Sequence, residues 1–407
     1  MQLIEPAGQP TGLSFCSGYA LEPGARLVFL SLITPERHGK VPVASSEQMH
    51  ACLDNLDDTL ALVGGHAEPL KVNYFATDSR EIAVAGRAWQ ERYGRQLAAA
   101  WLEGPASPVH EARVTMDLWA TAPPVRTPQG LRRVWDKGPV PVATVVDSAA
   151  TLHTLTAAPT AIAEGSGPVR DMADCLEQLD QQLAAMSASA SALAKLVVYL
   201  RDVRTWPPFR DMIIARYGPH CPALSPVMVA KTASPEHWVE VAAWAATPHT
   251  LEPPKGSGMG TADLRERILA SAGTGSIPIY IGATAHEMYT GYVPPATIEE
   301  HTHIAMRNQL AILRAAGSSL DHVFKSTWYL TDLRERAGVE AVAHEYFGRD
   351  LPTPSFVEIS RLAPVGARLE TDLWATIPST ARIGCPLTSN RPRRHNRQPG
   401  EPSRSEH

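Results

Sequence analysis

Two glutamates stand at matching places in two similar segments, and their surroundings favour acid–base chemistry. Glu240 follows Ser225 by 15 residues, and Glu370 follows Ser355 by the same spacing. Strand alternation places each glutamate on the same face as a tryptophan four residues later. A carboxyl group beside aromatic and apolar neighbours has its pKa raised by desolvation and can act as a general acid or base. The alternative reading of each residue is a solvated or salt-bridged strand glutamate.

A segment that precedes Ser225 and Glu240 in the chain contains a candidate cationic ligand. It reads Tyr199-Leu-Arg201-Asp202, whereas the two sister segments read Phe75-Ala-Thr77 and Tyr329-Leu-Thr331. Only this copy places an arginine there, and a guanidinium binds carboxylates through a fork of N–H donors. Tyr199 and Arg201 are therefore candidate substrate ligands. The alternative is an arginine paired with Asp202 or with a surface glutamate.

Three lysines in one register reveal an internal repeat. Lys71, Lys195 and Lys325 each open an alternating segment that ends on an aspartate seven residues later. Two further markers follow each lysine in step, first an aromatic–glycine pair and then a tryptophan: Tyr93-Gly94 and Trp119, Tyr217-Gly218 and Trp244, Phe347-Gly348 and Trp374. The chain therefore contains three tandem copies. A lysine present in every copy favours a structural role over Schiff-base chemistry.

Each copy shows the same order of elements. Leucines at helical spacing predict helices in Cys52-LDNLDDTL and Cys175-LEQLDQQL, with Met306-RNQLAIL as the looser third copy. Capping boxes are predicted at Ser45–Gln48 and Thr297–Glu300. We expect a strand (27–31 and 277–282), the helix, a strand from the lysine, a second helix that ends at the glycine, and two closing strands. Cys52 and Cys175 share one place on the apolar stripe, so both are expected to be packed thiols.

The composition restricts the class of protein. The chain has 407 residues, of which 44% are hydrophobic and 19% charged, with a net charge of −5. This predicts two to three folded domains without a general attraction for nucleic acid. No apolar run approaches the roughly 20 residues of a membrane span, and the N-terminus, which has no basic residue before Arg26, does not read as a signal peptide. Five cysteines without C-x-x-C spacing argue against disulfides and zinc, so we expect a cytoplasmic protein.

The weaker motifs predict neither cofactor nor metal. Gly256-SGMG-Thr261 resembles a phosphate loop but lies in a linker without a preceding strand. Glu299, His301 and His303 could suggest a metal, but helix residues two apart do not converge.

The markers set the boundaries of three units. The first unit spans residues 10–123, the second 139–248 and the third 276–379. Proline-rich or glycine-rich linkers separate them. Residues 380–407 are polar and rich in arginine, proline and serine, so we expect a disordered basic tail.

These segments resemble the RidA (YjgF) family of small α/β proteins. The first unit carries GY, VFLSLITP, HGKVP and a closing WAT strand; the third carries NQLAILRAAGSSLDHVFKSTWYLTDL and PTPSFVEISRL. The resemblance implies the RidA-like (chorismate-mutase-like) α/β (α+β) fold, in which family members form trimers with ligand clefts between subunits. Three fused copies would then form a pseudo-trimer within one chain, monomeric or weakly self-associating, whose clefts can be specialised separately.

The resemblance also implies a small-molecule chemistry, the hydrolysis of reactive imines or enamines. In the family an arginine in a Pro-x-Arg-Ser pattern clamps the substrate carboxylate, and a strand glutamate, here Glu240 or Glu370, positions water. The arginine is absent in all three copies, which read Pro352-Thr-Pro354-Ser355, Pro222-Ala-Leu224-Ser225 and Pro105-Ala106-Ser107, the last with the position deleted. A bidentate guanidinium cannot be replaced by these residues, so the family's arginine-dependent way of deaminating 2-imino acids is not expected of this chain.

Other cleft residues implied by the resemblance are retained. Tyr19 and Ser31 belong to the first unit, where they would join the serine and glutamate of a neighbouring unit. The third unit has Gly282 in place of Ser31. For Tyr19 and Ser31 the alternative is a strand-end hydroxyl that caps its own backbone.

Three functions follow from these observations. The first is a cofactor-independent RidA-like hydrolase, lyase or deaminase that acts on a small carboxylated metabolite, with secondary metabolism as the expected setting. The second is a chorismatase-like reaction, because chorismatases share a Tyr-x-Arg strand, a stretch similar to Gly282-Ala-Thr-Ala285 and a terminal strand glutamate. The third is a non-catalytic binder or scaffold that has lost the family's arginine.

Overall fold

The computed structural model describes most of the chain between residues 26 and 377, together with short N-terminal strands. The described residues are 2–4, 15–16, 18–20, 26–63, 66–94, 97–123, 131–135, 141–147, 151–159, 167–218, 221–232, 236–247, 251–252, 270–271, 277–284, 292–315, 318–348 and 351–377. The predicted tail (380–407) and the Gly256–Thr261 loop lie outside them.

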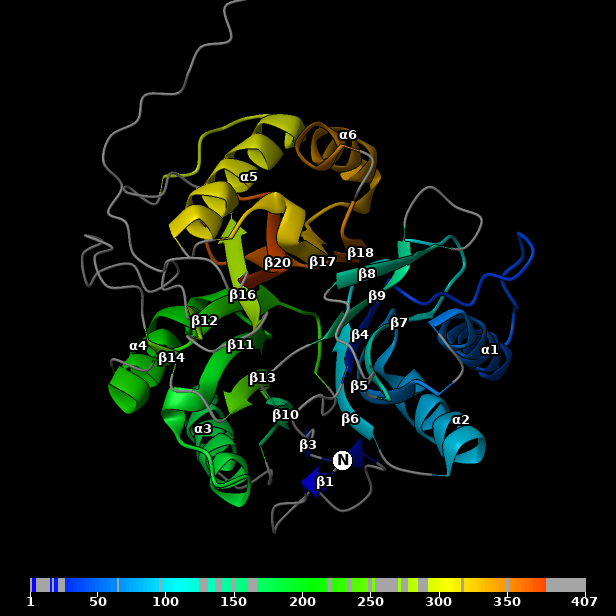
Figure 1. The fold of residues 1–407 in the computed structure, drawn as a ribbon, viewed down its shortest axis with the longest axis horizontal. Coiled ribbons are helices and arrows are strands. Elements are labelled where there is room, and N and C mark those ends of the chain that lie inside the picture. Colours follow the sequence, from blue (N-terminus) through cyan, green and yellow to red (C-terminus); the bar gives the residue numbers. More distant parts are fainter. Residues whose placement is uncertain are drawn as a thin grey trace, which may run out of the picture.

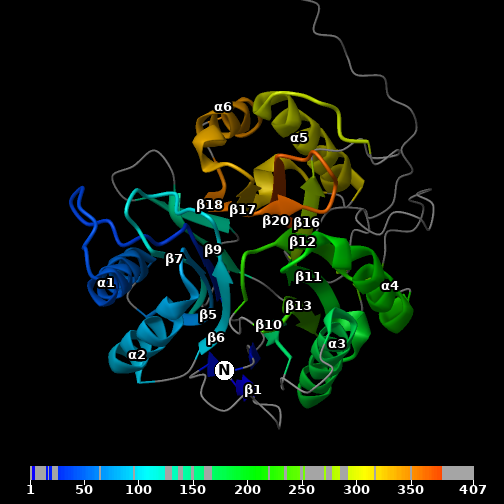
Figure 2. The same ribbon diagram turned by 180° about the vertical axis from the view of Figure 1, so that it is seen from behind.

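Three β-sheets surround a common centre, and each sheet carries a pair of helices on its outer side (Figures 1 and 2). The helices are α1 (Ser45–Val63) and α2 (Ile82–Tyr93), α3 (Pro168–Ala185) and α4 (Trp206–Tyr217), and α5 (Ile298–Ala315) and α6 (Arg336–Phe347). The predicted helices around Cys52, Cys175 and Met306 are confirmed. No helix in the described ranges is long and apolar enough to cross a membrane.

The first sheet has seven strands. Their order is β2 (Phe15–Cys16), β6 (Leu97–Glu103), β5 (Glu68–Ala76), β7 (Val114–Ala122), β4 (Arg26–Leu30), β9 (Pro141–Asp147) and β8 (Leu131–Trp135). β9 falls within the predicted second unit, yet it pairs with β4. Sheet membership therefore crosses the predicted boundary at residue 139.

The second sheet also has seven strands. Their order is β1 (Gln2–Ile4), β3 (Gly18–Ala20), β10 (Thr151–Ala157), β13 (Val239–Thr247), β11 (Leu193–Leu200), β12 (Ala223–Met228) and β19 (Arg361–Leu362). β3 comes from the N-terminal segment and pairs with β10, while β19 comes from the third unit and pairs with β12. Strands from the N-terminal segment and from the third unit thus extend the second sheet at its two sides.

The third sheet has four strands, β16 (Ile277–Thr284), β20 (Leu369–Ile377), β17 (Val323–Leu330) and β18 (Thr353–Glu358). A separate two-stranded ladder joins β14 (Leu251–Glu252) and β15 (Ala270–Ser271). The strands predicted at 27–31 and 277–282 correspond to β4 and β16.

Local signals explain where the helices end. α2, α4 and α6 each have 12 residues and stop at the aromatic residue of the predicted pair. The glycine that follows has φ of 61°, 51° and 63° in the three copies, a backbone region that glycine enters without steric cost. At the start of α5 the predicted capping box is formed, with Thr297 Oγ1 and Glu300 Oε2 each accepting the other residue's N–H.

The capping box predicted at the start of α1 is wrong. The Ser45 hydroxyl donates to Glu81 Oε1, and the Gln48 amide donates to the carbonyls of Pro42 and Glu111. Gln48 is buried, and its side chain fastens two loops to the helix instead of capping it.

Candidate functional site

The two candidate carboxylates are buried on the closing strands. Glu240 lies on β13 opposite Tyr199 of β11, and Glu370 lies on β20 opposite Tyr329 of β17. Directly opposed residues of an antiparallel pair point to the same face, so each carboxylate shares its face with a tyrosine. The exposed fractions are 1% for Glu240 and 2% for Glu370. The predicted alternative of a solvated glutamate does not apply to either one.

Burial and nearby carboxylates raise the pKa values of the two tyrosines. Burial raises the pKa of Tyr199 and that of Tyr329 well above the usual range. The charge of Glu240 adds to the pKa shift of Tyr199, and the charges of Asp372 and Asp117 add to both shifts. Tyr199 therefore lies in an acidic, water-poor surrounding, where its phenol remains protonated.

Lys325 joins the third unit to the first. Its Nζ donates to Asp117 Oδ1 at 2.6 Å, to Ser355 Oγ at 2.6 Å and to the Leu30 carbonyl at 2.8 Å. Ser355 Oγ in turn donates to Asp117 Oδ1 at 2.8 Å. Three buried polar groups thus satisfy one another across the seam between the units.

Lys195 makes the matching contact between the second unit and the third. Its Nζ donates to Ser225 Oγ at 2.5 Å and to Asp372 Oδ1 at 3.4 Å, and Ser225 Oγ donates to the same carboxylate at 2.8 Å. Burial lowers the pKa of Lys195 to about 8, although the charges of Asp372 and Glu370 act in the opposite direction. The predicted ligands Ser225 and Ser355 are therefore buried members of this network.

Lys71 joins the first unit to the second with different partners. Its Nζ donates to the Leu155 carbonyl at 2.9 Å and to Thr156 Oγ1 at 2.7 Å, and it lies 5.2 Å from the ring centroid of Trp244. The position that holds an aspartate in the other units is Ala242 in the second, since both residues precede the tryptophan by two. All three lysines are fully buried, which supports their structural reading.

The ladder corrects the predicted deletion in the first unit. Lys71 stands opposite Ala98 of β6 as Lys325 stands opposite Thr353 of β18. Ala99 therefore occupies the place of Pro354, and Ala100 that of Ser355. The run Pro105-Ala106-Ser107 lies beyond β6, in the following loop. The alanines of β6 carry no recognisable motif, so the sequence alone did not reveal the register of this strand.

Three tryptophans meet at the centre of the molecule. The ring centroids of Trp119 and Trp244 are 5.2 Å apart, those of Trp244 and Trp374 5.3 Å, and those of Trp119 and Trp374 6.4 Å. Each ring comes from a different unit, so the three sheets share one aromatic core.

Ser31 lies at the seam between the first and third units. The neighbouring Leu32 N–H donates to the Pro354 carbonyl at 3.3 Å, which brings Ser31 close to the strand that carries Ser355. Glu370, in contrast, lies near enough to Lys195 of the second unit for its charge to offset part of the lowering of the lysine's pKa by burial. Tyr19 pairs through its backbone with Thr154 of β10.

Arg201 stays close to its own hairpin. Its guanidinium carbon lies 5.5 Å from the ring centroid of Trp238, and Nη1 donates to the His237 carbonyl at 3.4 Å. Asp202, the partner that the alternative reading gave to Arg201, forms an ion pair with Arg204.

A cavity of about 280 Å³ lies between α6 and the sheet of the third unit. Pro354, which stands where the resemblance implies an arginine, is part of its wall, together with Arg336 and Glu340 from α6. Neither Glu240 nor Glu370 lines it; the cavity is on the helix side of the sheet, whereas Glu370 shares the opposite face with Tyr329.

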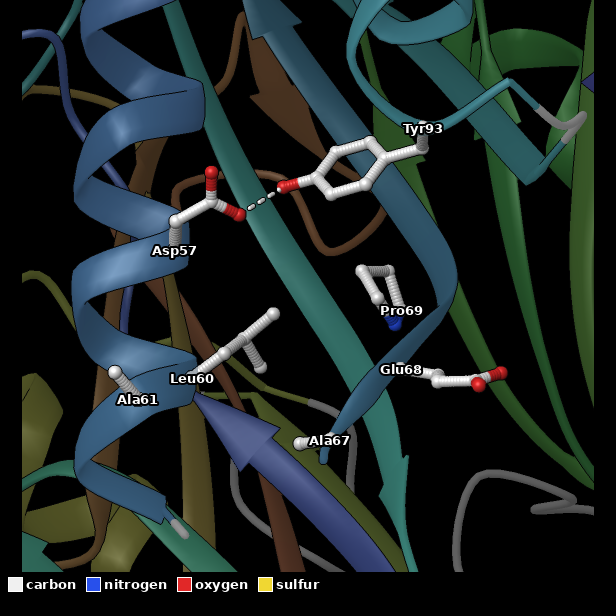
Figure 3. Close-up of a pocket in the computed structure, with 7 residues that line it drawn as sticks. All are labelled: Asp57, Leu60, Ala61, Ala67, Glu68, Pro69 and Tyr93. Carbon is white, nitrogen blue, oxygen red and sulfur yellow. Dashed lines mark hydrogen bonds between the residues drawn. The ribbon is translucent and has the colours of Figure 1, made fainter. Parts of the chain in front are cut away.

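A second cavity of about 520 Å³ lies between α1 and the start of β5 (Figure 3). Tyr93 donates a hydrogen bond to Asp57 at its edge, and Arg92 forms an ion pair with the same carboxylate. The second unit repeats this groove at about 240 Å³, with Arg216 paired to Asp180. This groove is a product of the repeated helix pair.

A repeated aspartate–arginine turn was missed in the sequence. The aspartate that closes each lysine segment accepts the backbone N–H of an arginine two residues later and forms an ion pair with its guanidinium: Asp78 with Arg80, Asp202 with Arg204, and Asp332 with Arg334. The recurring Asp-x-Arg spacing could have revealed it. The turn leads each strand into its second helix and has a structural role.

A metal site is not formed where the histidines suggested one. His301 Nε2 contacts the Pro294 carbonyl, and His303 Nδ1 contacts the Tyr346 hydroxyl. Across the described ranges, no group of three or more histidine, cysteine, aspartate or glutamate side chains is arranged to hold a metal ion.

Comparison with known proteins gives partial matches. The family model described as Endoribonuclease L-PSP matches residues 271–377. A RutC family protein of Pyrococcus abyssi is 44% identical over 73 residues, which are 18% of this chain and 58% of the relative, less than two thirds of its length. The 2-iminobutanoate/2-iminopropanoate deaminase of Rattus norvegicus is 30% identical over 98 residues, which are 24% of this chain and 71% of the relative.

A solved chorismatase structure is similar over a longer stretch. The match covers 88% of this chain and 99% of the chorismatase, with 13% identity and a TM-score of 0.49. Similarity of this degree does not extend to function. The family is shown instead by the sequence relatives, since the chain covers more than two thirds of the Rattus norvegicus deaminase at 30% identity, and on this ground the chain belongs to the RidA (YjgF) family.

Proposed function

We propose that the chain is a small-molecule enzyme of the RidA type, which hydrolyses a small carboxylated imine or enamine by acid–base chemistry. The observation that supports this most strongly is the burial of Glu240 and Glu370 at matching strand positions, each facing a tyrosine. The relative from Rattus norvegicus is named as an imino-acid deaminase, which makes 2-imino acids the first substrates to try.

The proposed reaction needs only water and proton transfer. A glutamate takes a proton from water, the oxygen attacks the imine carbon, and the imine nitrogen takes up a proton to give a carbinolamine. The C–N bond then breaks with release of ammonia, and the C=O bond of the 2-oxo acid forms. The glutamate returns to its starting state, so no cofactor is consumed.

We further propose that the three units close into an intramolecular pseudo-trimer. In support of this, the lysine contacts run in one direction: Lys325 of the third unit contacts the first, Lys71 of the first contacts the second, and Lys195 of the second contacts the third. A cyclic order of equivalent contacts is what a closed three-fold arrangement requires.

Glutamine variants test the proposed chemistry. Glu240→Gln and Glu370→Gln keep the size of the side chain but remove the base. We expect at least one of the two variants to hydrolyse 2-iminopropanoate about a hundredfold or more slowly than the wild type. Thr115→Val is the matched control, because Thr115 occupies the same ladder position opposite Phe75 in the first unit. Full activity in both glutamine variants would rule out the carboxylate mechanism.

Binding without turnover is the second candidate function. It is favoured by the commitment of Ser225 and Ser355 to the lysine–aspartate network, which leaves fewer polar groups for a substrate. The same assay separates the two: a folded wild-type protein without turnover on any 2-imino acid supports the binder.

A further inference from the structure

We infer that the cavity under α6 is a binding site for one small aromatic carboxylate per chain, with Arg336 as the anion ligand. This inference concerns binding on the helix side of the third sheet and goes beyond the acid–base chemistry proposed above. The apolar part of the cavity wall consists largely of aromatic and leucine side chains: Trp328, Phe347, Leu351 and Phe356.

The aromatic walls favour a flat ligand. Trp328 and Phe356 are nearly parallel, with an interplanar angle of 12° and ring centroids 6.2 Å apart. Aromatic rings gain from offset stacking or edge contacts with another ring. At about 280 Å³ the cavity falls near the lower end of ligand-site volumes, so a single-ring ligand fits this site better than a larger one.

Arg336 brings a positive charge to this apolar wall. Its guanidinium carbon lies 4.6 Å from the ring centroid of Phe356, an arrangement that holds the guanidinium plane against the ring. Glu340 accepts from Nε at 2.8 Å and lies 2.7 Å from Nη2. Both of these contacts go to one carboxylate oxygen, so the N–H donors of Nη1 take no part in the ion pair and are suited to a ligand carboxylate.

Ser326 places a further polar atom in the wall. It is 1% exposed, and its Oγ accepts the indole N–H of Trp328 at 3.1 Å. This bond fixes the orientation of the indole, while the serine O–H is a donor within the cavity lining. The wall therefore combines flat apolar surfaces with hydrogen-bond donors, which is the pattern of a site for an aromatic anion.

The first unit has lost this arrangement. α2 and α6 both have 12 residues, so Trp89 stands at the eighth position, where Ala343 lines the cavity in the third unit. Trp89 is 2% exposed, and the ladder places Tyr74 and Trp101 where the third unit has Trp328 and Phe356, with ring centroids 4.8 Å apart. A large indole thus takes the space that alanine leaves open.

In the second unit the corresponding space is filled by a residue at the start of the helix instead of one near its end. Trp206 is the first residue of α4, as Arg336 is the first of α6. Trp206 is 4% exposed and packs in the apolar core of this unit with Phe209 and Ile213. The guanidinium is thereby replaced by an indole, so we expect one site per chain instead of three.

Titration of the full chain with benzoate and benzamide tests the inference. The two probes have the same shape, but only benzoate carries a negative charge. We expect benzoate to bind with a stoichiometry of one per chain and about tenfold or more tightly than benzamide, since hydrogen bonds to a charged group are worth at least this factor. Failure of benzoate to bind, equal affinity for the two probes, or three sites per chain would overturn the inference.

Two variants with opposite expected effects make the test specific. Arg336→Gln should weaken benzoate about tenfold or more, to the level of benzamide, because the charge is lost. Glu340→Gln should strengthen benzoate, because the competing carboxylate is removed. Arg334→Gln is the matched control: it removes an equal charge two residues away, from a side chain that is 90% exposed and paired with Asp332. Unchanged benzoate affinity in Arg336→Gln would contradict the inference.

Filling the cavity provides an independent check. Ala343→Trp copies the residue that α2 carries, and should abolish binding of both probes while thermal unfolding shows that the chain is folded; retained binding in the folded variant would place the probe elsewhere. If this variant does not fold, the Arg336 and Glu340 variants still decide. Because binding is measured without turnover, a failure here leaves the glutamate mechanism intact, and inactive Glu370→Gln protein should still bind benzoate.

Discussion

The ammonium group of Lys325 lies 2.6 Å from Oδ1 of Asp117, a residue 208 positions earlier in the chain. Both side chains are buried, and Ser355 Oγ donates to the same carboxylate oxygen. A buried ion pair must recover the loss of hydration of both charges through close geometry and added hydrogen bonds. This pair meets that condition, so it fixes the third unit to the first in one register.

Removal of the carboxylate should therefore destabilise the protein strongly. Asp117→Ala leaves the Lys325 ammonium buried without its counterion, and we expect a loss of about 3–5 kcal/mol in the free energy of unfolding. Denaturant-induced unfolding, followed by tryptophan fluorescence, measures this loss.

The second seam supplies a matched comparison. Lys195 Nζ lies 3.4 Å from Asp372 Oδ1 instead of 2.6 Å, so Asp372→Ala should cost less than Asp117→Ala. The double variant Asp117→Leu/Lys325→Met should recover much of the loss, because it leaves no isolated charge. Equal losses at both seams, with no recovery in the double variant, would show that the ion-pair geometry does not set the stability.

The lysine register could be predicted from sequence, but the partners of the lysines could not. Lys325 and Asp117 belong to units far apart in the chain, and their contact depends on the direction in which the units wind. The same limit applies to β9, whose pairing with β4 follows from chain geometry and not from a motif. In contrast, strand alternation alone placed Glu240 and Glu370 on the same face as a tryptophan, although it left open whether the two carboxylates are buried or solvated, which the packing of the units decides.

The cavity depended on side-chain volume, which periodicity does not report. The helical pattern is the same whether the eighth residue of the second helix is Trp89 or Ala343, because both residues are apolar. Only packing against the sheet decides whether space remains. The charge of Arg336 was likewise hidden, because arginine at a helix start usually reads as a solvated residue.

Lys195 should add to the stability as the pH rises through the window set by its own pKa. Burial lowers the pKa of Lys195 from 10.5 to about 8. Below pH 8 both the folded and unfolded chains carry the proton, so the contribution is constant. Between pH 8 and 10 the unfolded chain binds more protons than the folded one, so the free energy of unfolding increases with pH, by at most about 1.4 kcal/mol per unit. Burial also raises the thiol pKa values of Cys52 and Cys175, which act in the opposite direction within this window, and the raised tyrosine pKa values do so above pH 10.

Unfolding measured at pH 8 and 9.5 in wild type and in Lys195→Met/Asp372→Leu checks this window. The double variant removes the titrating group together with its counterion, so the difference between the two proteins isolates Lys195 from Lys325. The expected result is a less positive pH dependence of the free energy of unfolding in the double variant than in the wild type. The same pH slope in both proteins would show that Lys195 keeps an ordinary pKa.

The central tryptophans should contribute a large share of the stability. Trp244 is 1% exposed and touches the rings of both Trp119 and Trp374. Trp244→Ala opens a cavity where the three units meet, and we expect a loss of about 3–5 kcal/mol in the free energy of unfolding, with a weaker near-ultraviolet circular dichroism signal. Trp238→Ala, at a half-buried indole beside Arg201, is the control and should cost clearly less.

A single glycine limits the approach of the first unit to the third. A Cβ atom at Gly104 would lie 2.7 Å from the carbonyl oxygen of Glu358, and this backbone atom cannot move aside easily. Gly104→Ala should therefore destabilise the protein by about 1–3 kcal/mol through overpacking. The control is Gly167→Ser at the start of α3, where a Cβ meets nothing within 4 Å and serine is a favoured N-cap. Thermal unfolding should show a lower midpoint for Gly104→Ala only; equal midpoints would mean that the two units separate at this contact without cost.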